Sequence, residues 1–162
     1  MGWRDAFFAQ ARSEQALRQQ LNVLKVEYSH QLHYLQMVTE KLAKSYASHP
    51  NSTEAPATSH AVFVRLLQAI KGRPDLRRKL GYENADVFAQ FINSLLPLAD
   101  KIQRLAPNFA GTTNPNPEYP WRDQATNEVI APVDFEFSDF GPKLAQMIEL
   151  ERLIDAMVRL GV

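Results

Sequence analysis

The chain has 162 residues, and its 18 basic and 18 acidic side chains give a formal net charge of zero. This length is typical of one domain with its own hydrophobic core, and neutrality excludes attraction to nucleic acid or anionic lipid through the overall field. Any such contact would depend on a local patch of charge. The absence of cysteine excludes disulfides, thiolate metal sites and a cysteine nucleophile.

The amino-terminal sequence MGWRDAFFAQAR is amphipathic and charged, unlike the basic cap and apolar run of a secretory signal. No stretch approaches the roughly 18 consecutive apolar residues that a membrane-spanning helix needs. We therefore expect a soluble, cytoplasmic protein without membrane contact, organised as a single domain over residues 1–162.

The amino-terminal part combines two helical patterns with a loop. The first predicted helix covers residues 2–21, with Arg12 and Arg18 expected at solvent, and the second covers 27–48. Residues 49–59 are rich in Pro, Ser, Thr and Asn, whose side chains compete with helical hydrogen bonds. This segment is therefore predicted to be a loop.

Further helices are predicted after this loop. Ser59 is expected to cap a helix over residues 60–71, and the segment 74–80 forms a short helix that begins with proline. A long apolar helix follows over 84–105, and the last helix covers 142–160.

Residues 107–141 form a long irregular insertion before the last helix, since six of the ten prolines lie between positions 107 and 142. Its aromatic residues predict an ordered lid that packs against the helices. The segment 128–137 has an extended pattern, but Pro132 interrupts it and we expect no second strand to pair with it. The predicted fold is all-α: an up-and-down bundle of four main helices and one short helix, with this insertion.

The second predicted helix carries the most informative pattern of the chain. Opposite its apolar stripe lie the polar residues Gln36, Glu40, Lys41 and Lys44. Their order, a Gln before a Glu-Lys pair and then a further Lys, resembles the second helix of HEPN domains (higher eukaryotes and prokaryotes nucleotide-binding). The stripe itself consists of Tyr28, Leu32, Leu35, Thr39, Leu42 and Tyr46.

The resemblance extends over most of the chain, although none of its motifs is specific alone. The first helix begins Trp-Arg-Asp and contains Ala-Arg-Ser at 11–13, KIQRLAP occupies 101–107 and EYPW occupies 118–121, in the family's order of elements. The resemblance implies a helical bundle that commonly forms a homodimer. It also implies metal-independent RNA cleavage in a toxin–antitoxin or defence system, or nucleotide binding beside a nucleotidyltransferase partner.

One departure from the family pattern bears on mechanism. Ribonucleolytic members carry an Arg, then four to six residues, then a His that moves a proton at the ribose 2′-hydroxyl while the Arg stabilises phosphate charge. No Arg stands five to seven positions before any of the four histidines, which are His30, His33, His49 and His60. The sequence therefore favours binding without the usual RNase chemistry, or a catalytic site rebuilt from other residues.

A metal site has one weak candidate. Glu27, His30 and His33 recur at three-residue spacing on one helix and could face one ion. A di-iron bundle needs two Glu-x-x-His units and further carboxylates, whereas this chain has one. We expect no metal and no cofactor, and ordinary surface or packing histidines explain the pattern better.

Two groups of residues are candidates for ligand binding. Glu40, Lys41 and Lys44 could hold a phosphate, although charges at this spacing also occur on any solvated helix face. Tyr119, Trp121 and Arg122 bring a phenol, an indole and a guanidinium into a loop, where binding residues concentrate. The alternative is that the aromatic rings only fasten the lid.

A basic cluster of five cations within nine residues would attract a phosphate or an RNA backbone. It has no aromatic residue among its members for base stacking, so a solvated face or a protein contact remains an alternative. Its members are Lys71, Arg73, Arg77, Arg78 and Lys79.

The sequence thus predicts a HEPN-like, nucleotide- or RNA-associated protein that acts by binding. A non-catalytic protein-interaction subunit is the alternative, and a metal-dependent helical-bundle enzyme is a weaker one. If the chain has an activity, metal-independent RNA cleavage is the one that the resemblance implies.

Overall fold

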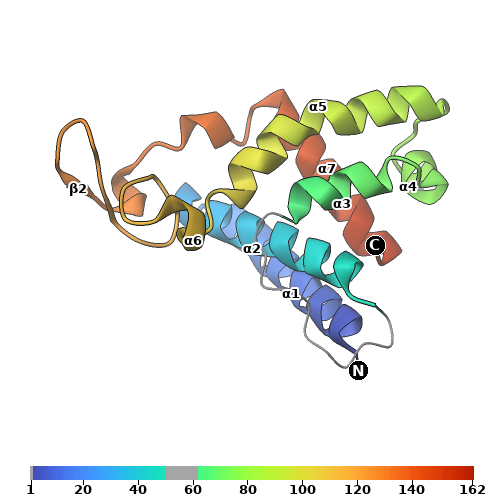
Figure 1. Ribbon diagram of the computed structural model, residues 1–162, viewed down its shortest axis with the longest axis horizontal. Coiled ribbons are helices and arrows are strands. Elements are labelled where there is room, and N and C mark those ends of the chain that lie inside the picture. The colour runs from blue at the N-terminus through green and yellow to red at the C-terminus, as the bar shows by residue number, and fades with distance from the viewer. Residues whose placement is uncertain (1, 50–61) are drawn as a thin grey trace.

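The computed structural model describes residues 2–49 and 62–162, and helices dominate both ranges (Figure 1). The predicted all-α bundle is confirmed. Within these ranges, no helix combines the length and hydropathy needed to cross a membrane. The helices are α1 (Trp3–Val23), α2 (Tyr28–Ala47), α3 (Phe63–Ile70), α4 (Pro74–Lys79), α5 (Ala85–Gln103), α6 (Pro107–Ala110) and α7 (Ala145–Leu160).

Capping residues fix two of the helix ends. The Asn84 side chain accepts hydrogen bonds from the backbone N–H groups of Asp86 and Val87, at 2.7 and 3.2 Å, and so starts α5. Gly161 ends α7 with a φ of 74°, a conformation that glycine adopts without a side-chain clash. Most of the predicted loop 49–59, together with the Ser59 cap, lies outside the described residues.

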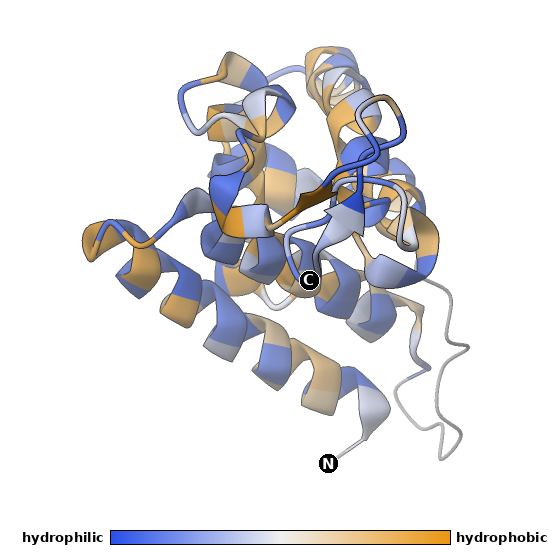
Figure 2. Cartoon of the chain, turned by 90° about the vertical axis from the view of Figure 1, so that its left-hand side faces the viewer, coloured by the Kyte–Doolittle hydropathy of each residue, from blue (hydrophilic) through white to orange (hydrophobic). Residues whose placement is uncertain are grey.

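The core lies between α2, α3, α5 and α7, while α1 packs along the other side of α2 (Figure 1). Leu32, Leu35 and Leu42 of the predicted stripe are fully buried, which confirms the helical period over this part of α2. Tyr46 is 43% exposed, so the stripe ends one turn earlier than expected. Hydrophilic and hydrophobic residues alternate along the helices, as an amphipathic bundle requires (Figure 2).

The insertion contains more regular secondary structure than the sequence predicts. The strands β1 (Trp121–Arg122) and β2 (Val129–Ile130) pair antiparallel, with Trp121 opposite Ile130. The expectation that no strand would pair with the extended segment was therefore wrong. Two single-turn 3₁₀-helices, η1 (Pro132–Asp134) and η2 (Ser138–Phe140), complete the segment.

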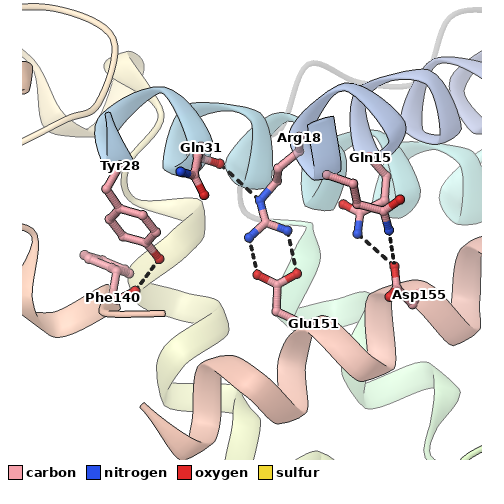
Figure 3. Close-up of polar contacts among 8 residues, drawn as sticks. Gln15, Arg18, Tyr28, Gln31, Phe140, Glu151 and Asp155 are labelled. Atoms are coloured by element: carbon pink, nitrogen blue, oxygen red, sulfur yellow. Dashed lines mark hydrogen bonds and ion pairs between the residues drawn. The ribbon is translucent and has the colours of Figure 1, made fainter. Parts of the chain in front are cut away.

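A buried arginine joins three helices (Figure 3). The Arg18 guanidinium on α1 donates through Nε to the Gln31 carbonyl on α2, at 3.1 Å, and through both terminal nitrogens to the Glu151 carboxylate on α7. The expectation that Arg18 would lie at solvent was wrong, because it is 8% exposed. Beside it, Asp155 accepts hydrogen bonds from Gln15 at 2.9 Å and Gln19 at 3.1 Å.

We expect Arg18→Ala to lower the free energy of unfolding by about 2–3 kcal/mol, because it leaves the Glu151 carboxylate and the Gln31 carbonyl without their donor. The loss is smaller than for a fully buried pair, since the Glu151 side chain is 33% exposed. Urea denaturation measures it, with Arg12→Ala on the same helix as the control. Arg12 is exposed and its change should cost no more than about 0.5 kcal/mol. Equal losses in the two variants would contradict the role assigned to Arg18.

Candidate functional site

The predicted phosphate-binding residues of α2 lie against α1 and bind one another. The Lys44 ammonium contacts a Glu40 oxygen at 2.5 Å, and Gln36 donates to the other Glu40 oxygen at 2.9 Å. The Lys41 ammonium lies 3.0 Å from the Glu14 carboxylate of α1. The alternative of a solvated helix face does not hold, because α1 covers these residues and the side chains of Glu40, Lys41 and Lys44 are 15, 19 and 14% exposed.

We call the set of paired polar side chains between α1 and α2 the polar seam. The set consists of Glu14, Gln36, Glu40, Lys41 and Lys44. Glu14 is the member of this seam that the sequence did not predict. Its side chain is only 4% exposed, and its Oε2 atom has no hydrogen-bond partner among the described residues. The available signal was its spacing, since Ala11, Glu14, Gln15 and Arg18 fall on one helical face and are all buried. A buried carboxylate with few partners depends strongly on its one cation. The seam therefore has a structural task that competes with ligand binding.

The second predicted group is divided between the core and the surface. The Trp121 indole is 2% exposed and packs edge-to-face against Phe135, with ring centroids 5.0 Å apart. Tyr119 is 55% exposed, and the exposed Arg122 donates to the Asn127 carbonyl at 2.8 Å. Trp121 thus anchors the insertion with a buried ring, and within this group only Tyr119 and Arg122 are exposed to solvent.

The predicted basic cluster is also divided. Arg73 forms two hydrogen bonds with the Asp75 carboxylate, at 2.9 and 2.6 Å, and this guanidinium holds the pKa of Asp75 well below its usual range. Arg77 donates to the Glu83 carbonyl. Arg78 is exposed and Lys71 is half-buried. Lys79 lines a surface cavity together with residues of α7.

Lys79 lies with two arginines of α7 around a surface cavity, which we call the basic hollow. Its volume is about 410 Å³. Arg152 donates to the Leu80 carbonyl and pairs with the Glu149 carboxylate at 3.3 Å, and its guanidinium lies 6.0 Å from the centre of the Tyr82 ring. The wall contains one carboxylate, Asp155, against three cations. The lining residues are Lys79, Leu80, Arg152, Asp155, Ala156 and Arg159.

A second cavity adjoins the basic hollow, because Arg159 lines both. Its volume is about 450 Å³, and Arg12 of α1 and Phe8 contribute to its wall. Cations from three helices therefore share one region of the surface.

The sequence contained a signal for Arg152 and Arg159 that composition alone did not reveal. The two residues are seven apart, which is two helical turns, so they lie on the same face of α7. Their proximity to Lys79 depends on the packing of α4 against α7 and could not be read from spacing.

The candidate metal ligands Glu27, His30 and His33 do not gather around one point in the described part of the chain. His33 Nδ1 lies 3.8 Å from the Glu118 carboxylate of the insertion, whereas His30 and Glu27 are exposed. No group of three metal-binding side chains gathers within residues 2–49 and 62–162. Burial lowers the pKa of His33, and the Glu118 charge opposes that shift.

No protein-family model, curated protein or solved structure matches this chain. The candidate site therefore depends on its own geometry. Among the predicted residues, Lys79 is the one that the structure combines with further cations in a concave surface.

We expect Lys41→Met to lower the free energy of unfolding by about 2–4 kcal/mol, because it leaves the Glu14 carboxylate buried without its cation. Adding Glu14→Leu should recover most of that loss, since an apolar pair carries no desolvation cost. Urea denaturation measures both variants. Lys143→Met, at an exposed position, is the control and should change stability by no more than about 0.5 kcal/mol. A Lys41→Met variant as stable as this control would contradict the assignment.

The His33 environment predicts a dependence of stability on pH. Because the folded pKa is lowered, the unfolded chain binds the proton more readily, so this contribution is complete above the unfolded value of about 6.5 and is lost as pH falls toward the folded pKa. His33→Asn should therefore flatten the curve of unfolding free energy between pH 7 and pH 5. Glu118→Gln should steepen it, because the charge that raises the His33 pKa is removed. Identical curves for wild type and His33→Asn would refute this account.

Proposed function

We propose that this protein is a HEPN-like, nucleotide- or RNA-associated protein that binds phosphate groups at the basic hollow and does not cleave its ligand. The observation that carries the proposal is the convergence of Lys79, Arg152 and Arg159 around one cavity. Arginine presents parallel N–H donors that match phosphate oxygens, and lysine adds a compact charge.

The local charge favours an anion although the chain as a whole is neutral. Asp155 is the one carboxylate of the lining, and it already accepts hydrogen bonds from Gln15 and Gln19. Arg12 adds a further cation across the adjoining cavity. A phosphate chain that crosses both cavities would meet positive charge from α4, α7 and α1.

The absence of cleavage follows from the side chains at this surface. None of the described residues that line the basic hollow is a histidine. Transfer of a proton from the ribose 2′-hydroxyl needs a base within hydrogen-bond reach, and the one carboxylate of the lining, Asp155, already accepts hydrogen bonds from Gln15 and Gln19. Binding without cutting is therefore the mode that these residues support.

The wider biological setting belongs to the same proposal. A HEPN-like binding protein would act in a bacterial toxin–antitoxin or defence system, as a homodimer or beside a partner such as a nucleotidyltransferase. The alternative, a non-catalytic interaction subunit, is favoured by the apolar tip of the α1–α2 turn, where Val23 and Leu24 are 80% and 72% exposed.

Fluorescence polarisation with a short labelled single-stranded RNA, measured over a series of salt concentrations, tests the proposal. Lys79→Ala and Arg159→Ala should each weaken binding for all sequences and reduce the salt slope by about 0.7, the value for one lost phosphate contact. Lys143→Ala is the matched control, because it lies before the opposite end of α7 from Arg159.

Three outcomes contradict the proposal. Wild-type protein that does not bind RNA or nucleotides would favour the interaction subunit. Equal weakening in the control would remove the basic hollow as the site. RNA cleavage without added metal would show a rebuilt catalytic site, which the Lys79 and Arg159 variants would help to locate.

A further inference from the structure

A separate pocket lies between the carboxyl end of α5, the helix α6 and the η2 turn of the insertion. Its volume is about 600 Å³, within the range of small-molecule sites. It shares no lining residue with the basic hollow. We call it the insertion pocket.

The apolar part of the insertion pocket is built from phenyl groups. Phe135 and Phe137 pack edge-to-face, with centroids 5.0 Å apart, and both contact the buried Trp121 ring. Phe109 contributes from α6 and is 45% exposed. Because Trp121 anchors the two insertion rings, this apolar surface exists before any ligand arrives.

The charged side chains of the pocket are separated by sign. Lys101 in the last turn of α5 and Arg104 directly after that helix are three residues apart and so occupy one wall. Glu136 and Asp139 come from the insertion and occupy the other. The four formal charges cancel, so the lining does not favour a simple anion or a simple cation. It matches a molecule that carries one charge of each sign.

One ion pair crosses between the two walls. The Lys101 ammonium lies 2.8 Å from the Asp139 carboxylate, and these side chains are 52% and 66% exposed. Such an exposed pair contributes little to stability, so a ligand can exchange with it at small cost. A ligand ammonium can replace that of Lys101 at Asp139, while a ligand carboxylate binds the released Lys101. Arg104 uses its Nε for Asp100, at 2.8 Å, and keeps further donors on its guanidinium.

We propose that the insertion pocket binds a zwitterionic small molecule with an apolar body, of the class of free aromatic or large aliphatic amino acids. The ammonium binds Asp139, the carboxylate binds Lys101, and the side chain contacts the phenyl surface. This proposal is independent of phosphate binding at the basic hollow.

Isothermal titration calorimetry with L-phenylalanine as the probe tests the pocket. Three comparison ligands each lack one feature: 3-phenylpropionate has no ammonium, 2-phenylethylamine has no carboxylate, and glycine has no apolar body. L-phenylalanine should bind with saturation, and each comparison ligand should bind about tenfold more weakly or worse, because a charge-assisted contact or the apolar contact is lost.

Single substitutions assign the two charges. Asp139→Asn should abolish the difference in affinity between L-phenylalanine and 3-phenylpropionate. Lys101→Gln should abolish the difference in affinity between L-phenylalanine and 2-phenylethylamine. Lys143→Gln should leave all affinities unchanged. Both tested positions are exposed, so thermal unfolding should show that the variants remain folded.

The proposal is overturned if L-phenylalanine shows no saturable binding at millimolar concentration. It is also overturned if 3-phenylpropionate or glycine binds as tightly as L-phenylalanine, or if Asp139→Asn and Lys101→Gln keep the wild-type ligand preference.

Discussion

The Arg18 guanidinium is the constraint on which the arrangement of α1, α2 and α7 depends. A buried arginine must satisfy its donors within the protein, and here the Gln31 carbonyl and the Glu151 carboxylate do so together (Figure 3). Arg18 and its two partners come from three helices, so these hydrogen bonds favour a rotation of α1 that turns Arg18 toward α2 and α7. That rotation also turns Glu14 and Gln15 toward the neighbouring helices.

A polar seam therefore takes the place of an ordinary apolar stripe on α1. Glu14 needs Lys41, and Glu40 is bound by Gln36 and Lys44, so the polar residues of α2 are used in joining the hairpin. Removing one member of this set leaves a buried charge without its partner. Truncating an apolar side chain would lose only buried apolar surface area. This difference explains why a motif that suggests a ligand site from its sequence has a structural task in the folded chain.

The sequence was sufficient for most helix positions, because apolar periodicity, Asn84 and Gly161 mark the elements locally. It was not sufficient to predict the burial of Arg18. Residue spacing shows which residues share a helix face, but it does not show which carboxylate of another helix will bind the arginine. The strand at Trp121 was missed because two residues carry no alternation to detect. The basic hollow escaped prediction because Lys79 and Arg159 are brought together only by tertiary packing.

The charge pattern of α7 connects this seam with the proposed phosphate site. Glu151 and Asp155, four residues apart, bind α1, whereas Arg152 and Arg159, seven apart, line the hollow beside α4. Arg152 also pairs with Glu149, at 3.3 Å, but Lys79, Arg152 and Arg159 together outnumber the one carboxylate of the lining, so the hollow keeps a positive charge for a ligand. One helix thus supplies carboxylates to α1 and arginines to the hollow, with Asp155 reaching both. Overall neutrality is compatible with a strongly positive local surface, because attraction at short range depends on the nearest charges and not on their sum.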